Sequence, residues 1–335
     1  MKKAAFYTLG CKVNQYETEA MAELFADSGY EIKEFTEVAD VYVINTCSVT
    51  NMGDRKSRQI IRRAKKLNPN AVIAVTGCYA QTAPDEVLAI EGVNLVLGTK
   101  DRKNIVTLVE ELNTESNINH VSDIMSNHEF EELQIKQYSN RTRAFIKIQE
   151  GCNQFCSYCI IPYARGPVRS RAKDDVVREI KELAHNGFKE IILVGIHVAS
   201  YGVDLGDTTL ESLIMDVDKI DGVERIRLSS IEPMTLNQEF IDSIKDSKKL
   251  CHHFHISLQS GCDETLKRMN RKYTTAQFKG IVDGLREAFN DVAITTDIMV
   301  GFPDESDEEF NKTVEFVRNI KFADAHVFQY SQRRG

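Results

Sequence analysis

The sequence has no apolar run that approaches the roughly 20 residues a membrane-spanning helix needs. It also has no signal-peptide core, because the N-terminal MKKAAFYTLG offers two lysines and an apolar run that stops at once. These absences predict a cytoplasmic protein without a membrane partner. Structural disulfides are rare in that compartment, so the eight cysteines favour metal binding or catalysis.

An excess of positive charge is also missing. Lysine and arginine number 42 against 50 aspartates and glutamates, which gives a net charge of −8, whereas nucleic-acid-binding proteins are often basic. The total argues against a general nucleic-acid binder, and we expect no DNA partner. Local basic clusters nevertheless occur in RKSRQIIRRAKK, YARGPVRSRAK and KRMNRK. The first is equally well explained as the solvated face of an amphipathic helix.

Strand-like and helix-like segments alternate over the first 112 residues. The apolar runs KAAFYTL, DVYVIN, AVIAVTG and VNLVLG are separated by helix-like segments such as QYETEAMAELFADSG. This alternation predicts a Rossmann-like domain, a parallel sheet with helices on its faces, over residues 1–112. The polar, irregular segment 113–140 is predicted to be a linker.

The alternation restarts in the remainder of the chain, residues 141–335. Helix-like segments separate most of its six apolar runs, which are 144–149, 190–198, 225–231, 253–259, 294–300 and 323–330. Six strands are too few for a complete eight-stranded barrel, so we expect a partial (β/α)6 barrel of TIM type.

The stretch GCNQFCSYC has three cysteines but no fourth. Cys152, Cys156 and Cys159 follow the first predicted strand of the second domain, where barrel active sites lie. Three thiolates can hold three irons of a [4Fe–4S] cluster and leave the fourth iron open to another ligand. The alternative is a structural zinc site, whose distant fourth ligand would be Cys251, Cys262, His252, His253 or His255. Otherwise we expect Cys251 and Cys262 to be packing residues.

A second incomplete triplet lies in the first domain. Cys11, Cys47 and Cys78 each follow a predicted strand. Because the carboxyl ends of parallel strands share one edge of a sheet, the three thiols are predicted to converge there. The glycines before Cys11 and Cys78 would allow close approach of the backbone. The alternative is three unrelated buried cysteines.

The segments around both triplets resemble the radical S-adenosylmethionine (radical-SAM) enzymes, and among them the methylthiotransferases. The resemblance covers nearly the whole chain. It is closest to the bacterial members that act on N6-threonylcarbamoyladenosine (t6A) in tRNA, while other members act on isopentenyladenosine in tRNA or on a ribosomal-protein aspartate. The segments that carry it are GCNQFCSYCIIPYARGPVRSR, TLGCKVNQYETEAM, INTCSVTNMGDRKSRQIIRRA, TGCYAQ and SLQSGCDETLKRMNRKYTT.

The resemblance implies two [4Fe–4S] clusters and S-adenosylmethionine (SAM). One cluster, on Cys152, Cys156 and Cys159, would bind SAM and generate a 5′-deoxyadenosyl radical. An auxiliary cluster, on the first-domain triplet, would carry the sulfur. The activity implied is addition of a methylthio group to C2 of t6A adjacent to the anticodon, with an electron donor such as flavodoxin or ferredoxin. The non-enzymatic alternative is a zinc-stabilised RNA-binding protein.

Further site residues are expected near the second triplet. Arg165, Arg169 and Arg171 follow the cysteine loop, where we expect them to contact RNA phosphates, and Tyr163 is expected to stack on a base. Tyr158 would pack on the SAM adenine. Other candidate SAM contacts, at predicted strand ends, are Gly195, Glu232, Gln259 and Asp297. Each of these is alternatively a satisfied structural polar group.

The sequence departs from the family pattern in two places. Family members carry a C-terminal RNA-binding TRAM domain, whereas this chain ends after its sixth apolar run. In VGFPDES, Asp304 and Ser306 stand where the pattern has a glycine and a threonine.

Overall fold

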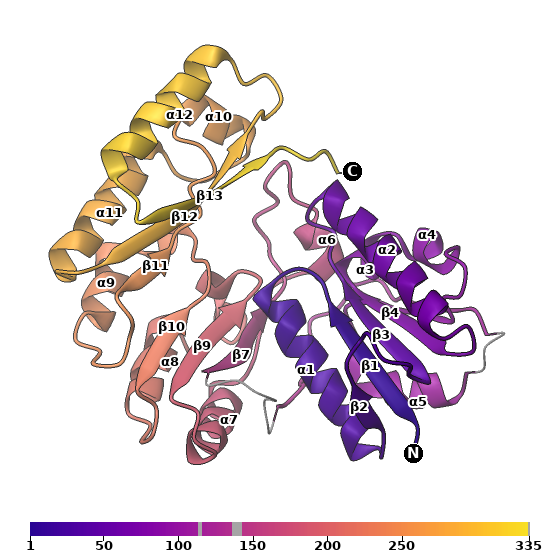
Figure 1. The fold of residues 1–335 in the computed structure, drawn as a ribbon. Helices are drawn as coiled ribbons and strands as arrows, with labels where there is room; N and C mark the ends of the chain where they lie inside the picture. Colours follow the sequence, from indigo (N-terminus) through magenta and orange to yellow (C-terminus); the bar gives the residue numbers. More distant parts are fainter. Residues whose placement is uncertain (113–115, 136–142, 334–335) are drawn as a thin grey trace.

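The computed structural model describes residues 1–112, 116–135 and 143–333, which form two halves built around parallel sheets (Figure 1). In the first half, the described strands make a six-stranded parallel sheet in the order β2-β1-β3-β4-β5-β6. The strands are β1 (Lys3–Thr8), β2 (Glu31–Lys33), β3 (Val41–Thr46), β4 (Val72–Gly77), β5 (Leu95–Leu97) and β6 (Ile118–His120).

Helices cover both faces of this sheet. Side chains of α2, α3 and α4 pack in one apolar cluster with strand residues such as Ile44 and Val75, while α1 and α5 pack with Val43 and Leu95 on the other face. Burial on both faces explains why β3 is a continuous apolar run. The helices are α1 (Lys12–Asp27), α2 (Asn51–Leu67), α3 (Cys78–Thr82), α4 (Pro84–Leu88), η1 (Arg102–Asn104) and α5 (Ile105–Glu110).

The second half contains the six predicted parallel strands. They follow one another in the order β7, β9, β10, β11, β12, β13 and form two sheets, β8-β7-β9-β10 and β11-β12-β13, in the first of which the short β8 pairs antiparallel with β7. Isolated parallel bridges from Ile226 to Leu250 and from Ile231 to Ile256 link the two sheets. The strands are β7 (Arg143–Glu150), β8 (Arg169–Ser170), β9 (Glu190–Gly195), β10 (Arg225–Leu228), β11 (His253–His255), β12 (Ala293–Val300) and β13 (Asp324–Gln329).

The helices of the second half are α6 (Ile161–Arg165), α7 (Lys173–His185), η2 (Val198–Ser200), α8 (Leu210–Asp218), η3 (Pro233–Thr235), α9 (Gln238–Ile244), α10 (Asp263–Arg268), α11 (Thr275–Ala288) and α12 (Asp307–Ile320). The longer helices α7, α8, α11 and α12 lie along the outside of the strands, while α6 lies beside α3 of the first half (Figure 1). The predicted fold class, a parallel α/β domain followed by a partial barrel, is therefore confirmed. No helix in the described part of the chain is long and apolar enough to span a membrane.

Three short strands were not predicted from the sequence. β2 and β6 are three residues each, β8 is two residues long, and β6 lies within segment 113–140, which was predicted to be a linker. All three residues of β6 are exposed and its backbone continues the sheet beside β5, so apolar periodicity could not reveal it. The rest of the predicted linker falls partly on 113–115 and 136–140, which lie outside the described residues.

Candidate functional site

The first-domain cysteines lie at one edge of the sheet. Cys11 precedes α1 after β1, Cys47 follows β3, and Cys78 begins α3 directly after β4. These three strands are parallel neighbours, so the three cysteines, which follow their carboxyl ends, lie at the same edge of the sheet. A Cβ on Gly10 would lie 3.1 Å from Cys47 Sγ, and Gly10 has φ +102°, so a glycine is required beside this thiol.

The three cysteines of this triplet differ in how deeply they are buried. Cys11 is exposed, Cys47 is partly buried and Cys78 is buried. Burial raises the pKa of the Cys47 thiol, and it raises the pKa of Cys78 to about 11. Arg165 of the second half donates from Nε to Cys78 Sγ at 3.3 Å, which places a fixed positive charge at this sulfur.

The second triplet lies on the loop between β7 and α6. The loop is held by the turn that follows α10: Ser157 N donates to Met269 O at 3.1 Å, and Asn270 Nδ2 donates to Phe155 O at 2.9 Å. Burial raises the pKa of Cys152 to about 11 and that of Cys159 to about 12.

An arginine also contacts the second triplet. Arg271 donates from Nη1 to Cys156 Sγ at 3.3 Å and from Nη2 to Glu232 Oε2 at 2.8 Å. Each triplet therefore has one cysteine hydrogen-bonded by a buried arginine. Among the described residues, no group of three or more His, Cys, Asp or Glu side chains is already arranged to hold a metal ion.

Three of the candidate SAM contacts lie at or after the carboxyl ends of barrel strands: Gly195 ends β9, and Glu232 and Gln259 follow β10 and β11. The prediction of a strand end is wrong for Asp297, which lies within β12. Glu232 is mostly buried and is paired with Arg271. Asp297 pairs with His255 Nε2 at 3.0 Å, so this carboxylate already has a partner. Gly195 lies close to Gln149, because a Cβ added to Gly195 would be 2.8 Å from Oε1 of Gln149. Gln259 is buried with φ +67°, and its Oε1 has no hydrogen-bond partner within the described chain.

Tyr158 packs within a small apolar cluster next to the cysteine loop. It contacts the cluster of Met269, Met299 and Phe302, with its ring centroid 6.4 Å from that of Phe302. The ring therefore lies beside the loop cysteines, as its position between Cys156 and Cys159 requires.

Two residues near this site were not predicted from the sequence. Arg271 was noted only as part of a basic cluster, and its contact with Cys156 depends on the fold. The Nε2 atom of His197 lies 4.0 Å from Glu232 Oε2. Burial lowers the pKa of His197 to about 4, which keeps the imidazole neutral at physiological pH. The only sequence signal for His197 is its place just after β9.

The prediction that Arg165, Arg169 and Arg171 contact RNA phosphates is wrong. Their exposed fractions are 0%, 1% and 1%, so phosphates do not reach them. Arg165 pairs with Glu17 and Glu150, Arg171 pairs with Glu179, and Arg169 donates to the Arg165 carbonyl at 2.9 Å. Buried guanidinium groups need such partners, because an unpaired buried charge is costly.

Arg165 belongs to a buried ion network between the two halves. Glu17 on α1 forms ion pairs with Arg102, Arg165 and Lys147. Lys147 also pairs with Glu150 on the same strand, with Nζ 2.7 Å from Oε2. Burial alone would raise the pKa of Glu17, but the surrounding positive charges outweigh it and lower the pKa to about 2.

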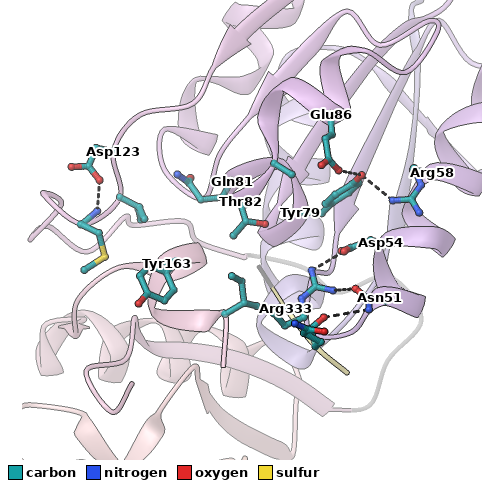
Figure 2. A pocket seen from close by; sticks show the side chains of 15 residues that line it. Asn51, Asp54, Arg58, Tyr79, Gln81, Thr82, Glu86, Asp123, Tyr163 and Arg333 are labelled. Atoms are coloured by element: carbon teal, nitrogen blue, oxygen red, sulfur yellow. Dashed lines mark hydrogen bonds and ion pairs between the residues drawn. The ribbon is translucent and has the colours of Figure 1, made fainter. Parts of the chain in front are cut away.

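Tyr163 differs from the arginines because 52% of it is exposed. It lines a cavity of about 1040 Å³, which we call the interdomain cavity (Figure 2). One wall carries Asn51, Tyr79 and Thr82, which follow Cys47 and Cys78 in the chain, and another carries Ile160 and Tyr163, which follow Cys159.

A smaller cavity of about 220 Å³ lies against the cysteine loop. Cys156, Tyr158 and Cys159 line it, and it shares Ile160, Tyr163 and Arg333 with the interdomain cavity. The two cavities therefore adjoin, and Cys156 and Cys159 line the smaller one, whereas none of the first-domain cysteines lines either cavity.

Two family models match the chain, one on each half. The model described as the Radical SAM superfamily matches residues 146–317, and the model described as Uncharacterized protein family UPF0004 matches residues 3–98. The radical-SAM match includes Cys152, Cys156 and Cys159, and the UPF0004 match includes Cys11, Cys47 and Cys78.

Solved structures with a similar fold are radical-SAM enzymes. The radical S-adenosylmethionine methyltransferase TsrM from Kitasatospora setae has a TM-score of 0.69 at 15% identity, over 98% of this chain and 75% of that one. The cobalamin-dependent S-adenosylmethionine radical enzyme OxsB has a TM-score of 0.60 at 11% identity, over 95% of this chain and 52% of that one. At such identities the likeness concerns the fold alone.

Curated relatives align along the full length of the chain. Threonylcarbamoyladenosine tRNA methylthiotransferase MtaB of Bacillus subtilis (strain 168) is 50% identical over 100% of this chain and 75% of the relative. The protein of the same name from Aquifex aeolicus (strain VF5) is 42% identical over 99% and 81%. A tRNA-2-methylthio-N(6)-dimethylallyladenosine synthase of Thermoanaerobacter pseudethanolicus (strain ATCC 33223 / 39E) is 39% identical over 98% and 71%. The chain therefore belongs to the radical-SAM tRNA methylthiotransferases, a family of transferase enzymes.

Proposed function

We propose that this chain adds a methylthio group to C2 of t6A next to the anticodon of tRNA, and that each cysteine triplet holds a [4Fe–4S] cluster. One cluster and SAM follow from membership of the radical-SAM enzymes. The t6A substrate is supported by the two relatives at 50% and 42% identity whose names specify it. The non-enzymatic alternative, a zinc-stabilised RNA-binding protein, is set aside because the family consists of enzymes.

The observation that carries the proposal is the pair of adjoining cavities, one lined by Cys156 and Cys159 and the other by residues that follow Cys47 and Cys78 in the chain. Sulfur insertion needs a nucleoside placed within reach of a radical source on one side and a sulfur source on the other. The interdomain cavity has α3, which begins at Cys78, on one wall and α6, which follows Cys159, on another. A cavity of about 1040 Å³ is large enough for a modified nucleoside.

The residues at each triplet fit an iron–sulfur cluster with one open iron. Each site offers three free thiols and no fourth cysteine at its loop or strand edge. A thiol loses its proton when it binds iron, and the arginine beside Cys78 or Cys156 would stabilise the resulting negative charge.

The remaining residues are proposed to bind and orient the reactants. When bound at Cys152, Cys156 and Cys159, the cluster would supply one-electron cleavage of SAM, with electrons from a donor such as flavodoxin or ferredoxin. Tyr163, at the wall shared by both cavities, is proposed to contact a base of the RNA. The proposed SAM-binding residues are Tyr158, Gly195, Glu232, Gln259 and Asp297. We also propose that 1–112 and 141–335 act as separate domains joined by 113–140.

The test uses the reconstituted protein and two RNA stem-loops, one carrying t6A and one carrying dimethylallyladenosine. We expect methylthio product from the t6A stem-loop, detected by mass spectrometry of the digested RNA. Product from the dimethylallyl stem-loop alone would show that the substrate is wrong.

A separate measurement tests the second cluster. The anaerobically reconstituted chain should contain about eight irons, and Cys78→Ala should reduce this to about four without preventing SAM cleavage. About four irons in both proteins would contradict a cluster at Cys11, Cys47 and Cys78.

A further inference from the structure

Two arginines of the described chain line the interdomain cavity near α2 (Figure 2). Arg333, on the segment after β13, donates to Asp54 Oδ2 at 2.7 Å, to Asn51 Oδ1 at 2.7 Å and to Ser48 Oγ at 2.8 Å. Its charge is therefore matched by a carboxylate of the protein itself.

Arg58 is held differently. It donates from Nη1 to the Tyr79 hydroxyl at 3.0 Å, and its guanidinium lies 5.8 Å from the centre of the Tyr79 ring. Burial raises the pKa of Tyr79, so this partner is a neutral phenol, which in turn donates to Glu86 Oε2 at 3.3 Å. Arg58 therefore bonds to a neutral hydroxyl, whereas Arg333 pairs with the carboxylate of Asp54.

The fixed position of Arg58 is unusual for its helix. The neighbouring basic residues Arg55, Lys56, Arg62 and Arg63 are exposed and do not line the cavity, as expected for the solvated face of an amphipathic helix. Arg58 is partly buried, and Figure 2 shows it at the end of the cavity where Tyr79 and Glu86 lie, across from Tyr163.

The two nucleosides named for the relatives differ by one negative charge. The threonylcarbamoyl group ends in a carboxylate, whereas the dimethylallyl group is a neutral hydrocarbon. A guanidinium that is already oriented can bind a carboxylate through two parallel hydrogen bonds. If a dimethylallyl group bound at this position instead, the guanidinium would lose its hydrogen bonds to water and gain none from the substrate.

We propose that Arg58 determines substrate specificity by pairing with the carboxylate of the threonylcarbamoyl group inside the interdomain cavity. This inference rests on the proposed function. It assigns Tyr79 a supporting role, because the phenol fixes the guanidinium plane while leaving its charge available to the substrate.

The test compares Arg58→Met and Arg58→Lys with wild type and with Arg63→Met, a control on the exposed side of α2. Each protein is assayed on a t6A stem-loop and on a stem-loop in which the threonine carboxylate is replaced by a carboxamide. For wild type we expect kcat/KM to be about 10- to 100-fold higher on the carboxylate RNA. Arg58→Met should remove most of this preference, chiefly through KM, and Arg58→Lys should keep part of it.

Measuring a ratio within each variant separates specificity from general loss of folding. A preference that is unchanged in Arg58→Met, or lost equally in Arg63→Met, would overturn the role of Arg58. If wild type instead modifies the dimethylallyl RNA and not the t6A RNA, the proposed substrate itself is wrong, and that outcome is distinct from the first.

Discussion

At the scale of single residues, Arg165 joins the two candidate sites. It lies on α6, shortly after Cys159, and its guanidinium contacts Cys78 of the other half while pairing with Glu17 and Glu150. All of these contacts except the one from Glu150 cross between the two halves. The residue that was predicted to contact RNA phosphates is therefore buried beside Cys78 of the first triplet.

Replacing Arg165 with methionine should destabilise the chain by about 3–5 kcal/mol, because it removes one positive charge from the buried carboxylates of Glu17 and Glu150. Urea unfolding of the metal-free protein measures this change. Arg178→Met is the matched control, since Arg178 and Asp175 form an exposed pair whose loss should cost no more than about 1 kcal/mol. Equal losses in the two variants would contradict the buried-network role.

Glu17 makes the same network sensitive to acid. Its pKa is lowered to about 2 in the folded chain, so its stabilising contribution is complete above the unfolded pKa of about 4.5 and is lost as pH falls toward 2. The stability difference between wild type and Glu17→Gln should therefore shrink between pH 5 and about pH 3. Free energies of unfolding across this range test the prediction, and a constant difference would refute it.

At the scale of elements, the cysteine loop depends on the turn after α10. Asn270 adopts φ +57° and donates to the Phe155 carbonyl within the loop. Asparagine tolerates this left-handed conformation better than most residues do. The same reasoning applies to Asp304, which has φ +63° where the family pattern has a glycine.

Asn270→Ala should lower the free energy of unfolding by about 1–2 kcal/mol, because it removes a hydrogen bond and adds backbone strain. Asn270→Gly keeps the backbone freedom and loses only the hydrogen bond, so its effect should be smaller. Urea unfolding of both variants decides the matter, and a larger loss in the glycine variant would argue against strain at this position.

The sequence predicted the elements that carry strong apolar periodicity and missed those that do not. The six barrel strands and both cysteine triplets followed from apolar runs and from the position of Cys11, Cys47 and Cys78 after strands. β6 is entirely exposed, so nothing in its composition indicated a strand. The partners of Arg165 and Arg271 lie far away in sequence, and only the fold brings them together.

At the scale of the whole molecule, the two halves lie side by side (Figure 1). Residues of both halves line the interdomain cavity, and a buried ion network joins the halves. The segment after β13 returns to the first half, where Arg333 pairs with Asp54 at the start of α2. The cavity is therefore bounded by the N-terminal half, by the cysteine loop and by the end of the described chain. The proposed reaction would need a substrate space of this kind, bordered by both halves.

The proposed reaction, methylthiolation of t6A in tRNA, is tested most directly by mass spectrometry of tRNA nucleosides from cells that contain the gene and from cells that lack it. We expect 2-methylthio-t6A to disappear with the gene and its t6A precursor to accumulate. Unchanged 2-methylthio-t6A, with loss of the methylthio derivative of dimethylallyladenosine instead, would contradict the proposal.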